Sequence, residues 1–421
     1  MGARHHSTLA QQRLSGYSPF ILRMRILGIE TSCDDTGVAL VEAEGNFGQE
    51  FSFKLLGNAL ASQAKLHAEY GGVFPSVAKR EHAKNLVPTL TLCLHDAEAL
   101  KEKHSDISHY HAELKTILER EPELLAQLVP SLAKHARPEV DAIAVTVGPG
   151  LEPCLWVGIN FARALSAVWN VPIVAVNHME GHIVMSIITF GNPNPDTSVK
   201  IEVSGSISNI EFPALALLVS GGHTELVLMR EFGKYEIIGR TRDDAVGEAF
   251  DKVARMLGLP YPGGPHISRL ALEARSSNLE ASFKLPRPMM NEDNFDFSFS
   301  GLKTAVLRLT ENRQLTTENK LMIAREFEDA VTDVLVGKTL RAVETHGANA
   351  VILGGGVSAN VHIRAELDRQ LSTVNCQLLV CPPEFSTDNA VMIALAGYFH
   401  ALKKEFATPE TLHANGSLKL G

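Results

Sequence analysis

Residues 215–224, Leu-Ala-Leu-Leu-Val-Ser-Gly-Gly-His-Thr, contain the pattern that decides the fold, an apolar run that ends in small residues. Such a run predicts a buried strand, and glycine at its end lets the backbone approach a ligand closely. The same pattern occurs at residues 143–150 and again at residues 350–360. Because exposed backbone N–H groups in such loops suit phosphate oxygens, the three loops together predict nucleotide binding between two α/β lobes.

The composition is typical of a globular protein with more than one lobe or domain. The chain has 421 residues, of which 45% are hydrophobic and 21% are charged, and this length is too great for one ordinary core. No apolar run reaches the roughly 20 residues that span a bilayer, so we expect no membrane association. Five scattered cysteines without a CxxC pair argue against a disulfide framework and favour a reducing compartment, the cytoplasm.

The charge distribution gives weaker indications. A net charge of −9 argues against a surface coated in positive charge for binding nucleic acid. Lys79, Arg80 and Lys84 form a candidate local basic patch, with a solvated helix face as the alternative. The first 29 residues lack Asp and Glu, which weakly resembles a transit peptide; we favour an extended start, with Met24 opening the first strand. Residues 96–137, charged and rich in Leu and Ala, predict a helical surface insertion.

Two histidines stand four residues apart in His178-Met-Glu-Gly-His182. On a helix this spacing places both imidazoles on one face, where they can bind one metal ion. We expect the third ligand to be Asp388, at the start of the last helix. Two unrelated histidines and a plain helix N-cap are the alternative interpretations. A zinc-protease interpretation is weak, because that motif places Glu directly after the first His and Glu180 stands one position later.

Eight short motifs, most of them rich in Gly, Ser or Asp, follow one another along the chain. They are Gly28-Ile-Glu-Thr-Ser-Cys-Asp-Asp-Thr36, His178-Met-Glu-Gly-His182, Leu218-Val-Ser-Gly-Gly-His-Thr224, Gly247-Glu-Ala-Phe-Asp-Lys252, Tyr261-Pro-Gly-Gly-Pro265, Phe297-Ser-Phe-Ser-Gly-Leu-Lys303, Gly354-Gly-Gly-Val-Ser-Ala-Asn360 and Ser386-Thr-Asp-Asn389. In this order they resemble the motifs of the bacterial tRNA N6-adenosine threonylcarbamoyltransferase family. The residues before Met24 and the segment 96–137 depart from the family pattern.

The resemblance implies an α/β fold of two RNase-H-like lobes around a central nucleotide cleft, as in actin, sugar kinases and heat-shock ATPases. The first lobe is expected at residues 24–177 plus 389–412, with the helical insertion at 96–137. The second lobe is expected at residues 178–388. Residues 1–23 are expected to form a disordered leader.

The resemblance also implies the activity, the cofactor and the partners. The chain is expected to be an acyltransferase that moves the threonylcarbamoyl group of threonylcarbamoyl-AMP to N6 of adenosine 37, in tRNAs that read codons beginning with A, and releases AMP. One divalent ion, iron(II) with zinc as the alternative, is expected on His178, His182 and Asp388. The expected partners are the tRNA anticodon loop, a paralogous non-catalytic subunit and a small ATPase.

Substrate contacts are implied at eight residues. They are Leu218, Val219, Ser220, Gly221, Gly222, Asp251, Gly264 and Asn360. For Asp251 the alternatives are solvent exposure or an ion pair with Lys252 or Arg255, and for Asn360 the alternative is a cap of the following helix. Backbone N–H groups of residues 220–222 are candidates for an oxyanion hole.

No catalytic residue is assigned, although Glu30 and Asp34 on the first loop are candidates for the general base. Three other functions are weighed against the transferase: a kinase or ATPase of the same fold, a non-catalytic nucleotide-binding scaffold, and a metallopeptidase. A kinase is expected to begin the first loop with Asp, where this chain has Glu30, and it does not need the histidine pair. A scaffold is expected to lack the metal-binding residues.

Overall fold

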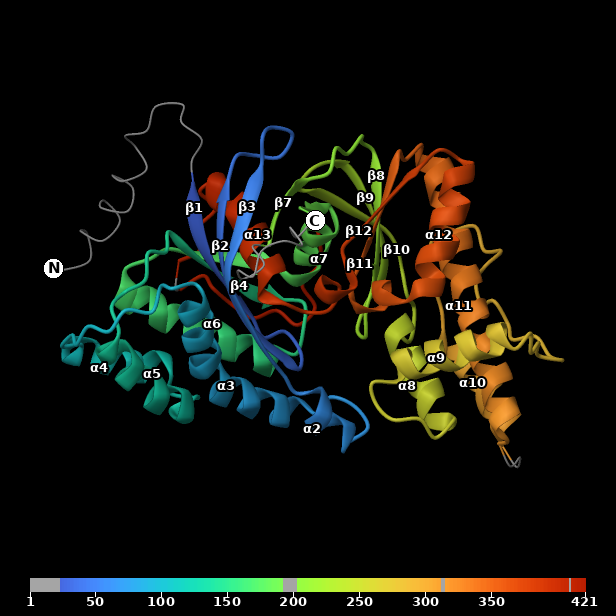
Figure 1. The fold of residues 1–421 in the computed structure, drawn as a ribbon, viewed down its shortest axis with the longest axis horizontal. Coiled ribbons are helices and arrows are strands. Elements are labelled where there is room, and N and C mark those ends of the chain that lie inside the picture. Colours follow the sequence, from blue (N-terminus) through green and yellow to red (C-terminus); the bar gives the residue numbers. More distant parts are fainter. Residues whose placement is uncertain (1–22, 192–202, 312–314, 409) are drawn as a thin grey trace, which may run out of the picture.

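Two mixed β-sheets carry the helices of the chain on their faces (Figure 1). The structure is a computed structural model that describes residues 23–191, 203–311, 315–408 and 410–421. The leader expected at residues 1–23 lies outside these ranges except for Arg23. We call the seven-stranded sheet and its helices the first lobe, and the five-stranded sheet and its helices the second lobe.

The strand order of the first sheet is β5-β4-β1-β2-β3-β7-β6, and that of the second is β10-β9-β8-β11-β12. The strands of the first sheet are β1 (Met24–Glu30), β2 (Asp35–Glu44), β3 (Ser52–Ser62), β4 (Ala142–Gly148), β5 (Ile173–Asn177), β6 (Ile188–Phe190) and β7 (Ser204–Ile207). Those of the second sheet are β8 (Ala214–Val219), β9 (Thr224–Glu231), β10 (Lys234–Arg240), β11 (Ala350–Gly354) and β12 (Gln377–Val380).

Both sheets contain the same five-stranded core. In the first, β1 pairs antiparallel with β2, β2 antiparallel with β3, and β1, β4 and β5 run parallel. In the second, β8, β9 and β10 are antiparallel neighbours, while β8, β11 and β12 run parallel. This arrangement, found twice, is that of an RNase-H-like lobe. The prediction of an α/β fold with two such lobes is therefore confirmed.

The central strands β4, β8 and β11 are buried along their whole length. Strands covered on both faces read as continuous apolar runs, and this explains why the sequence pattern identified these three. The strand β10, at an edge of its sheet, is partly exposed along its length instead.

Helices cover both sheets. Those that begin before residue 200 are α2 (Ala64–Ala68), α3 (Pro75–Asp96), α4 (His111–Ile117), α5 (Pro122–Lys134), α6 (Glu152–Trp169) and α7 (His178–Ser186). The later ones are α8 (Val246–Met256), α9 (Gly263–Ser276), α10 (Ser300–Thr310), α11 (Thr317–His346), α12 (Val361–Thr373) and α13 (Ala390–Leu402). Short 3-10 turns occupy η1 (Ser108–Tyr110), η2 (Gly356–Ala359) and η3 (Pro383–Phe385).

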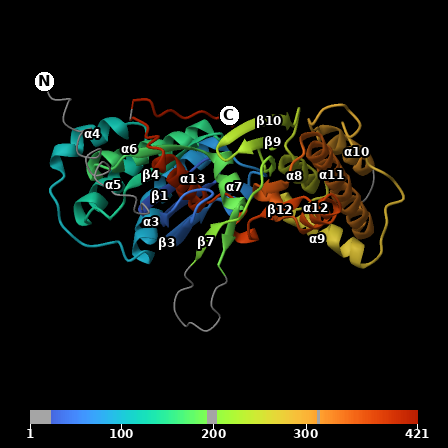
Figure 2. The ribbon, with the colours of Figure 1, turned by 90° about the horizontal axis from the view of Figure 1, so that it is seen from above.

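The helices α7 and α13 lie between the two sheets when the molecule is seen from above (Figure 2). The helix α13 packs on β1, β2 and β4, and α7 contacts α13 as well as β8 and β11. Every residue of α7 is buried. The two histidines of this helix are therefore held where the two lobes meet.

Two features bear on the expected domain boundaries. The strands β6 and β7, although they follow residue 178, extend the first sheet beyond β3. The segment 96–137 contains α4 and α5, and five of its leucines are buried in the core of the first lobe: Leu114, Leu118, Leu124, Leu128 and Leu132. The boundaries expected from the sequence remain predictions.

Among the described residues, no helix combines the length and the apolar character that a membrane span requires. All five cysteines are free thiols.

Candidate metal centre and adjoining glycine-rich loops

The histidine pair is positioned by the start of α7. The helix begins at His178 directly after β5, and the side chain of Asn177 caps it by accepting hydrogen bonds from the backbone N–H groups of Met179 and Glu180 at 2.9 and 3.4 Å. His178 and His182 are thereby one turn apart on the same face. Their rings lie 4.8 Å apart, nearly perpendicular to each other.

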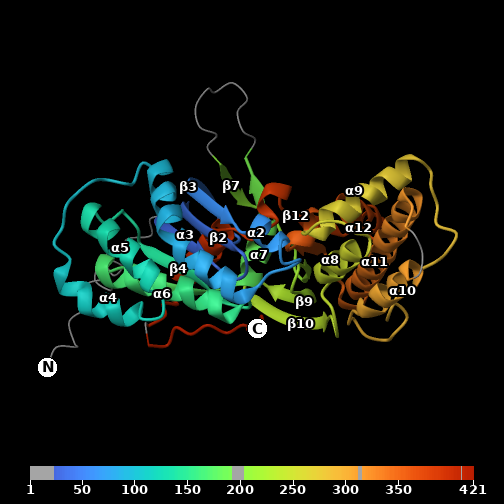
Figure 3. The ribbon, with the colours of Figure 1, turned by 90° about the horizontal axis from the view of Figure 1, so that it is seen from below.

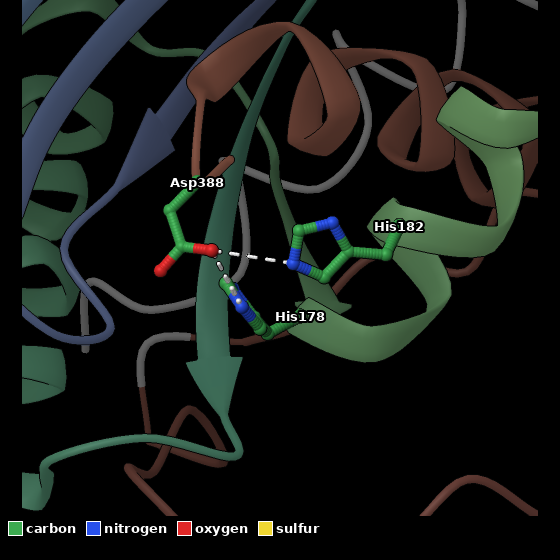
Figure 4. A group of neighbouring side chains, drawn as sticks. All are labelled: His178, His182 and Asp388. Carbon is green, nitrogen blue, oxygen red and sulfur yellow. Dashed lines mark hydrogen bonds and ion pairs between the residues drawn. The ribbon is translucent and has the colours of Figure 1, made fainter. Parts of the chain in front are cut away.

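Asp388 completes the group of three that the sequence predicts (Figure 4). Its Oδ1 atom lies 3.3 Å from Nε2 of His178 and 3.2 Å from Nε2 of His182. The candidate ligand atoms of the three residues all lie within 4.8 Å of one another. The alternative interpretation of Asp388 as a plain N-cap is wrong, because Asn389 caps α13 with a hydrogen bond from the N–H of Met392 at 3.1 Å.

Glu30 stands behind His178 and fixes its orientation. The Oε2 atom of Glu30 lies 3.1 Å from Nδ1 of His178 and accepts a hydrogen bond of 2.6 Å from the hydroxyl of Thr146. Its Oε1 accepts the N–H of Ser32 at 2.5 Å, and the side chain is fully buried. A proton on Nδ1 of His178 that points to a carboxylate leaves the Nε2 lone pair free, which is the usual arrangement of metal-binding histidines. The donor set therefore fits a metal ion.

The charges of the group favour a bound cation. Burial lowers the pKa of His178, but the carboxylates of Asp388 and Glu30 outweigh it and raise that pKa well above 6.5. Burial raises the pKa of Asp388, but the positive charge of His178 dominates and lowers it. The buried carboxylate of Glu30 and the partly exposed carboxylate of Asp388 thus face the imidazoles, and either a proton or a metal cation can balance their negative charge.

The glycine-rich loops lie against this group. Gly355, directly after β11, has φ +90°, and a Cβ atom there would lie 2.4 Å from the carbonyl oxygen of Val219 at the end of β8. Only glycine allows this backbone approach. A Cβ on Gly354 would lie 3.2 Å from the carbonyl oxygen of His182. The two loops therefore meet each other next to the metal-ligand helix.

In the loop after β8, residues 220–223, most backbone N–H groups form hydrogen bonds within the loop itself. The N–H of Ser220 donates to the carbonyl of His223 at 2.8 Å, and the N–H of Gly222 donates to the hydroxyl of Ser220 at 3.3 Å. Among the described residues, the N–H of Gly221 has no partner. Of the three predicted oxyanion donors, Gly221 is thus the one left available to a ligand. Burial, and then the charge of His178, lower the pKa of His223 to about 4.

The other expected substrate contacts surround the start of α9. Asp251 of α8 accepts the N–H of Gly263 at 2.7 Å, so one of its oxygens caps α9. The position where Gly264 would carry a Cβ is open. Asn360 is indeed the N-cap of α12, as the alternative interpretation had it, and its amide also donates to Ser268 and Glu328 at 2.9 and 2.7 Å. The structure thus gathers these residues in one region of the second lobe, with the Asn360 side chain already engaged.

Comparison with known sequences identifies the family of the chain. A family model described as tRNA N6-adenosine threonylcarbamoyltransferase matches residues 54–108 and 122–395. The chain is 40% identical to the tRNA N6-adenosine threonylcarbamoyltransferase of Nitrosospira multiformis over 374 residues, 89% of this chain and 90% of the relative. The chain belongs to the tRNA N6-adenosine threonylcarbamoyltransferase family. The protein of that name from Chromobacterium violaceum is also 40% identical, over 92% of this chain and 95% of its own length.

Similar solved structures are more distant. A crystal structure of full-length HypF in the phosphate- and nucleotide-bound form has a TM-score of 0.47 at 11% identity and covers 92% of this chain and 47% of HypF. The ROK hexokinase from Thermus thermophilus has a TM-score of 0.39 at 12% identity, and the match covers 90% of this chain and 100% of the hexokinase.

Membership in the threonylcarbamoyltransferase family makes the chain a tRNA-modifying transferase. The expected transferase is therefore confirmed against the kinase, scaffold and peptidase alternatives.

The sequence did not predict a network of hydrogen bonds and ion pairs around Glu180. Glu180, between the two histidines, accepts a hydrogen bond of 2.9 Å from the hydroxyl of Tyr235 in β10. Its second oxygen lies 2.8 Å from Nε2 of His400 in α13, whose Nδ1 faces Glu405 at 2.5 Å. Glu180 thus ties the metal-ligand helix to an element of each lobe. Its place inside the His-x-Glu-x-His motif was the only sign of this in the sequence.

Proposed function

We propose that the chain transfers the threonylcarbamoyl group of threonylcarbamoyl-AMP to N6 of adenosine 37, in tRNAs that read codons beginning with A, and releases AMP. In this step the N6–carbonyl bond forms, the bond between the carbonyl carbon and the phosphate oxygen of AMP breaks, and N6 loses one proton. The observation that supports the proposal most is the convergence of His178, His182 and Asp388 beside the glycine-rich loops.

His178, His182 and Asp388 would hold one divalent ion, for which we propose iron(II), with zinc as the alternative. When bound, such an ion polarises an oxygen of the substrate as a Lewis acid. Two imidazole nitrogens and one carboxylate are a donor set that suits either metal. Glu30 would keep the Nε2 lone pair of His178 directed at the ion, because its own carboxylate receives the proton of Nδ1.

The residues of the chain itself would bind and orient the donor. The free N–H of Gly221 can stabilise negative charge on the carbonyl oxygen, a contribution of roughly 3 kcal/mol for one donor in other enzymes. The adenosine half of the donor would bind against Asp251, at the open space next to Gly264; the hydrogen bond from Gly263 to Asp251 and that open space support this. Asn360 would act through its position in the loop, since its amide is already engaged by Ser268 and Glu328.

For the general base we propose Asp34 rather than Glu30. Glu30 is fully buried and both of its oxygens are hydrogen-bonded within the protein. Asp34 is partly exposed on the neighbouring loop, and burial together with the negative charge of Asp388 raises its pKa. A carboxylate with a raised pKa is a better proton acceptor near neutral pH.

We further propose that the chain works in the cytoplasm with a paralogous non-catalytic subunit and a small ATPase. The free cysteines agree with a reducing compartment. Family resemblance is the support for the two partner proteins.

The test is reconstitution. The chain and its partner enzymes are supplied with threonine, bicarbonate, ATP and tRNA, the tRNA is digested, and the nucleosides are analysed by mass. We expect threonylcarbamoyladenosine from the wild type, at least a hundredfold less from Asp388→Asn, and wild-type amounts from Asp293→Asn, an exposed acid used as the matched control. An unmodified adenosine at the target position after incubation with the wild type, or full activity of Asp388→Asn, would contradict the proposal.

A further inference from the structure

The segment between α2 and α3 presents two aromatic side chains to solvent. Tyr70 is 57% exposed and Phe74 is 53% exposed. Their rings lie 6.0 Å apart at an angle of 28°, so they are roughly parallel. Large aromatic side chains are usually buried, and paired aromatics on the surface suggest a binding site. We call these two residues the aromatic pair.

The backbone beneath the aromatic pair is held in place from inside the protein. His67 of α2 is fully buried, its carbonyl accepts the N–H groups of Tyr70 and Gly72, and its Nδ1 accepts the N–H of Phe74 at 3.3 Å. The other ring nitrogen of His67 lies 3.1 Å from the side-chain oxygen of Gln63. The internal contacts are therefore made by the backbone of this segment, and the two rings are left to solvent.

The aromatic pair lies at the junction of the lobes. Figures 1 and 3 both place α2 at the edge of the first lobe that faces α8 of the second. Arg255 of α8 donates a hydrogen bond to the carbonyl of Gly71, between the two aromatic residues. The N–H of Gln63, just before α2, donates to the carbonyl of Asp34 at 3.0 Å, so the start of α2 is tied to the loop that carries the proposed general base.

We propose that the aromatic pair stacks on an unpaired base of the anticodon loop of the acceptor tRNA and so holds the loop next to the transfer site. The inference rests on the proposed function. Proteins recognise single-stranded loops by stacking splayed bases on aromatic rings. The exposed Arg255, which makes no ion pair with a described residue, lies beside the pair, where it can contact a phosphate of the same loop.

The charge of the chain favours stacking, rather than electrostatic attraction, as the way in which the protein holds RNA. With a net charge of −9, the protein as a whole repels a polyanion. The cations of the candidate patch on α3 are also partly neutralised, because Lys79 lies 3.6 Å from Glu121 and both Arg80 and Lys84 lie within 3.7 Å of Glu81. Stacking does not depend on net charge, so it can position the RNA where the basic patch cannot.

The test measures transfer by the full chain, with its partner enzymes, over a range of tRNA concentrations. For the double variant Tyr70→Ala/Phe74→Ala we expect the KM for tRNA to rise about tenfold, within the range known for loss of one aromatic–base stack. The KM for the donor is expected to stay unchanged. The exchange variant Tyr70→Phe/Phe74→Tyr keeps both rings and should keep the wild-type KM. Leu272→Ala, which removes another exposed apolar side chain (63% exposed), is the matched control.

A second readout is the fluorescence of 2-aminopurine placed in the anticodon loop. Stacking on the aromatic pair should quench it in the wild type and leave it bright in the double alanine variant. An unchanged KM for tRNA in the double alanine variant would overturn the proposal. If that variant also lost binding of a partner protein, the aromatic pair would be a contact site for that protein and not for tRNA. Absence of modified nucleoside from the wild type would refute the proposed function, and this inference with it. Wild-type activity with an unaffected double variant would refute the inference alone.

Discussion

Replacing Glu30 with glutamine should weaken metal binding although Glu30 is not itself a proposed ligand. The wild-type carboxylate receives three donors: the N–H of Ser32 at 2.5 Å, the hydroxyl of Thr146 at 2.6 Å and Nδ1 of His178 at 3.1 Å. A glutamine side chain of the same shape can keep only one oxygen there. If that oxygen faces Ser32, the amide NH2 faces Thr146 and His178.

The two neighbours of that NH2 group respond differently. The hydroxyl of Thr146 can rotate and accept a hydrogen bond. His178 can accept only if its proton moves from Nδ1 to Nε2, the nitrogen directed at Asp388. In the opposite amide orientation, the NH2 group of the glutamine faces the N–H of Ser32. Two buried donors then lack an acceptor, which costs about 1–3 kcal/mol. Glutamine therefore favours the His178 tautomer that cannot bind the ion.

Loss of such an orienting partner typically weakens metal binding about 10- to 100-fold, or roughly 1.4–2.7 kcal/mol. The assay is titration of metal-free protein with zinc against a chromophoric chelator. Thr146→Val is the control, because it removes a donor to Glu30 but keeps the contact between Glu30 and His178, and it should change the dissociation constant by less than about threefold. Equal affinities for wild type and Glu30→Gln, or equal losses in both variants, would refute this account of Glu30.

Three further predictions follow from the same contacts. Because its carboxylate neighbours raise the pKa of His178 well above 6.5, a proton competes with the metal at neutral pH, and the zinc dissociation constant should fall as the pH rises from 6 to 8; a constant value would contradict this. Burial lowers the pKa of His400, but Glu180 and Glu405 raise it to about 9, so its stabilising effect is complete below pH 6.5 and disappears as the pH rises through 9. The melting temperature should accordingly drop more on His400→Gln at pH 6 than at pH 10, and an equal drop at both would count against the ion pairs. Gly355→Ala should destabilise the protein by about 2 kcal/mol or more in urea unfolding, because of the left-handed φ and the close carbonyl of Val219; wild-type stability would show that this loop can move aside.

Much of the fold could be predicted because its central strands are covered on both faces. An apolar run that ends in glycine identified β4, β8 and β11, and the loops after β8 and β11 do meet. The histidine spacing likewise predicted one helical face, since four residues make about one turn.

The tertiary contacts of the site could not be predicted from the sequence. Glu30 and His178 are 148 residues apart, and no local pattern shows that a buried carboxylate will face an imidazole. Asp388 and Asn389 are both good capping residues, and only the structure shows that Asn389 takes the cap and leaves Asp388 free to face the histidines. The sequence also could not show which N–H groups of residues 220–222 are used within their own loop.

The central claim is that His178, His182 and Asp388 hold one metal ion on which transfer to tRNA depends. The most direct test is elemental analysis of the purified full-length chain and of Asp388→Asn, with transfer activity measured on the same preparations before and after chelation and metal return. The account predicts one divalent ion per wild-type chain, little in the variant, and activity that disappears on chelation and returns with iron(II) or zinc. Full transfer by metal-free wild-type protein would contradict it.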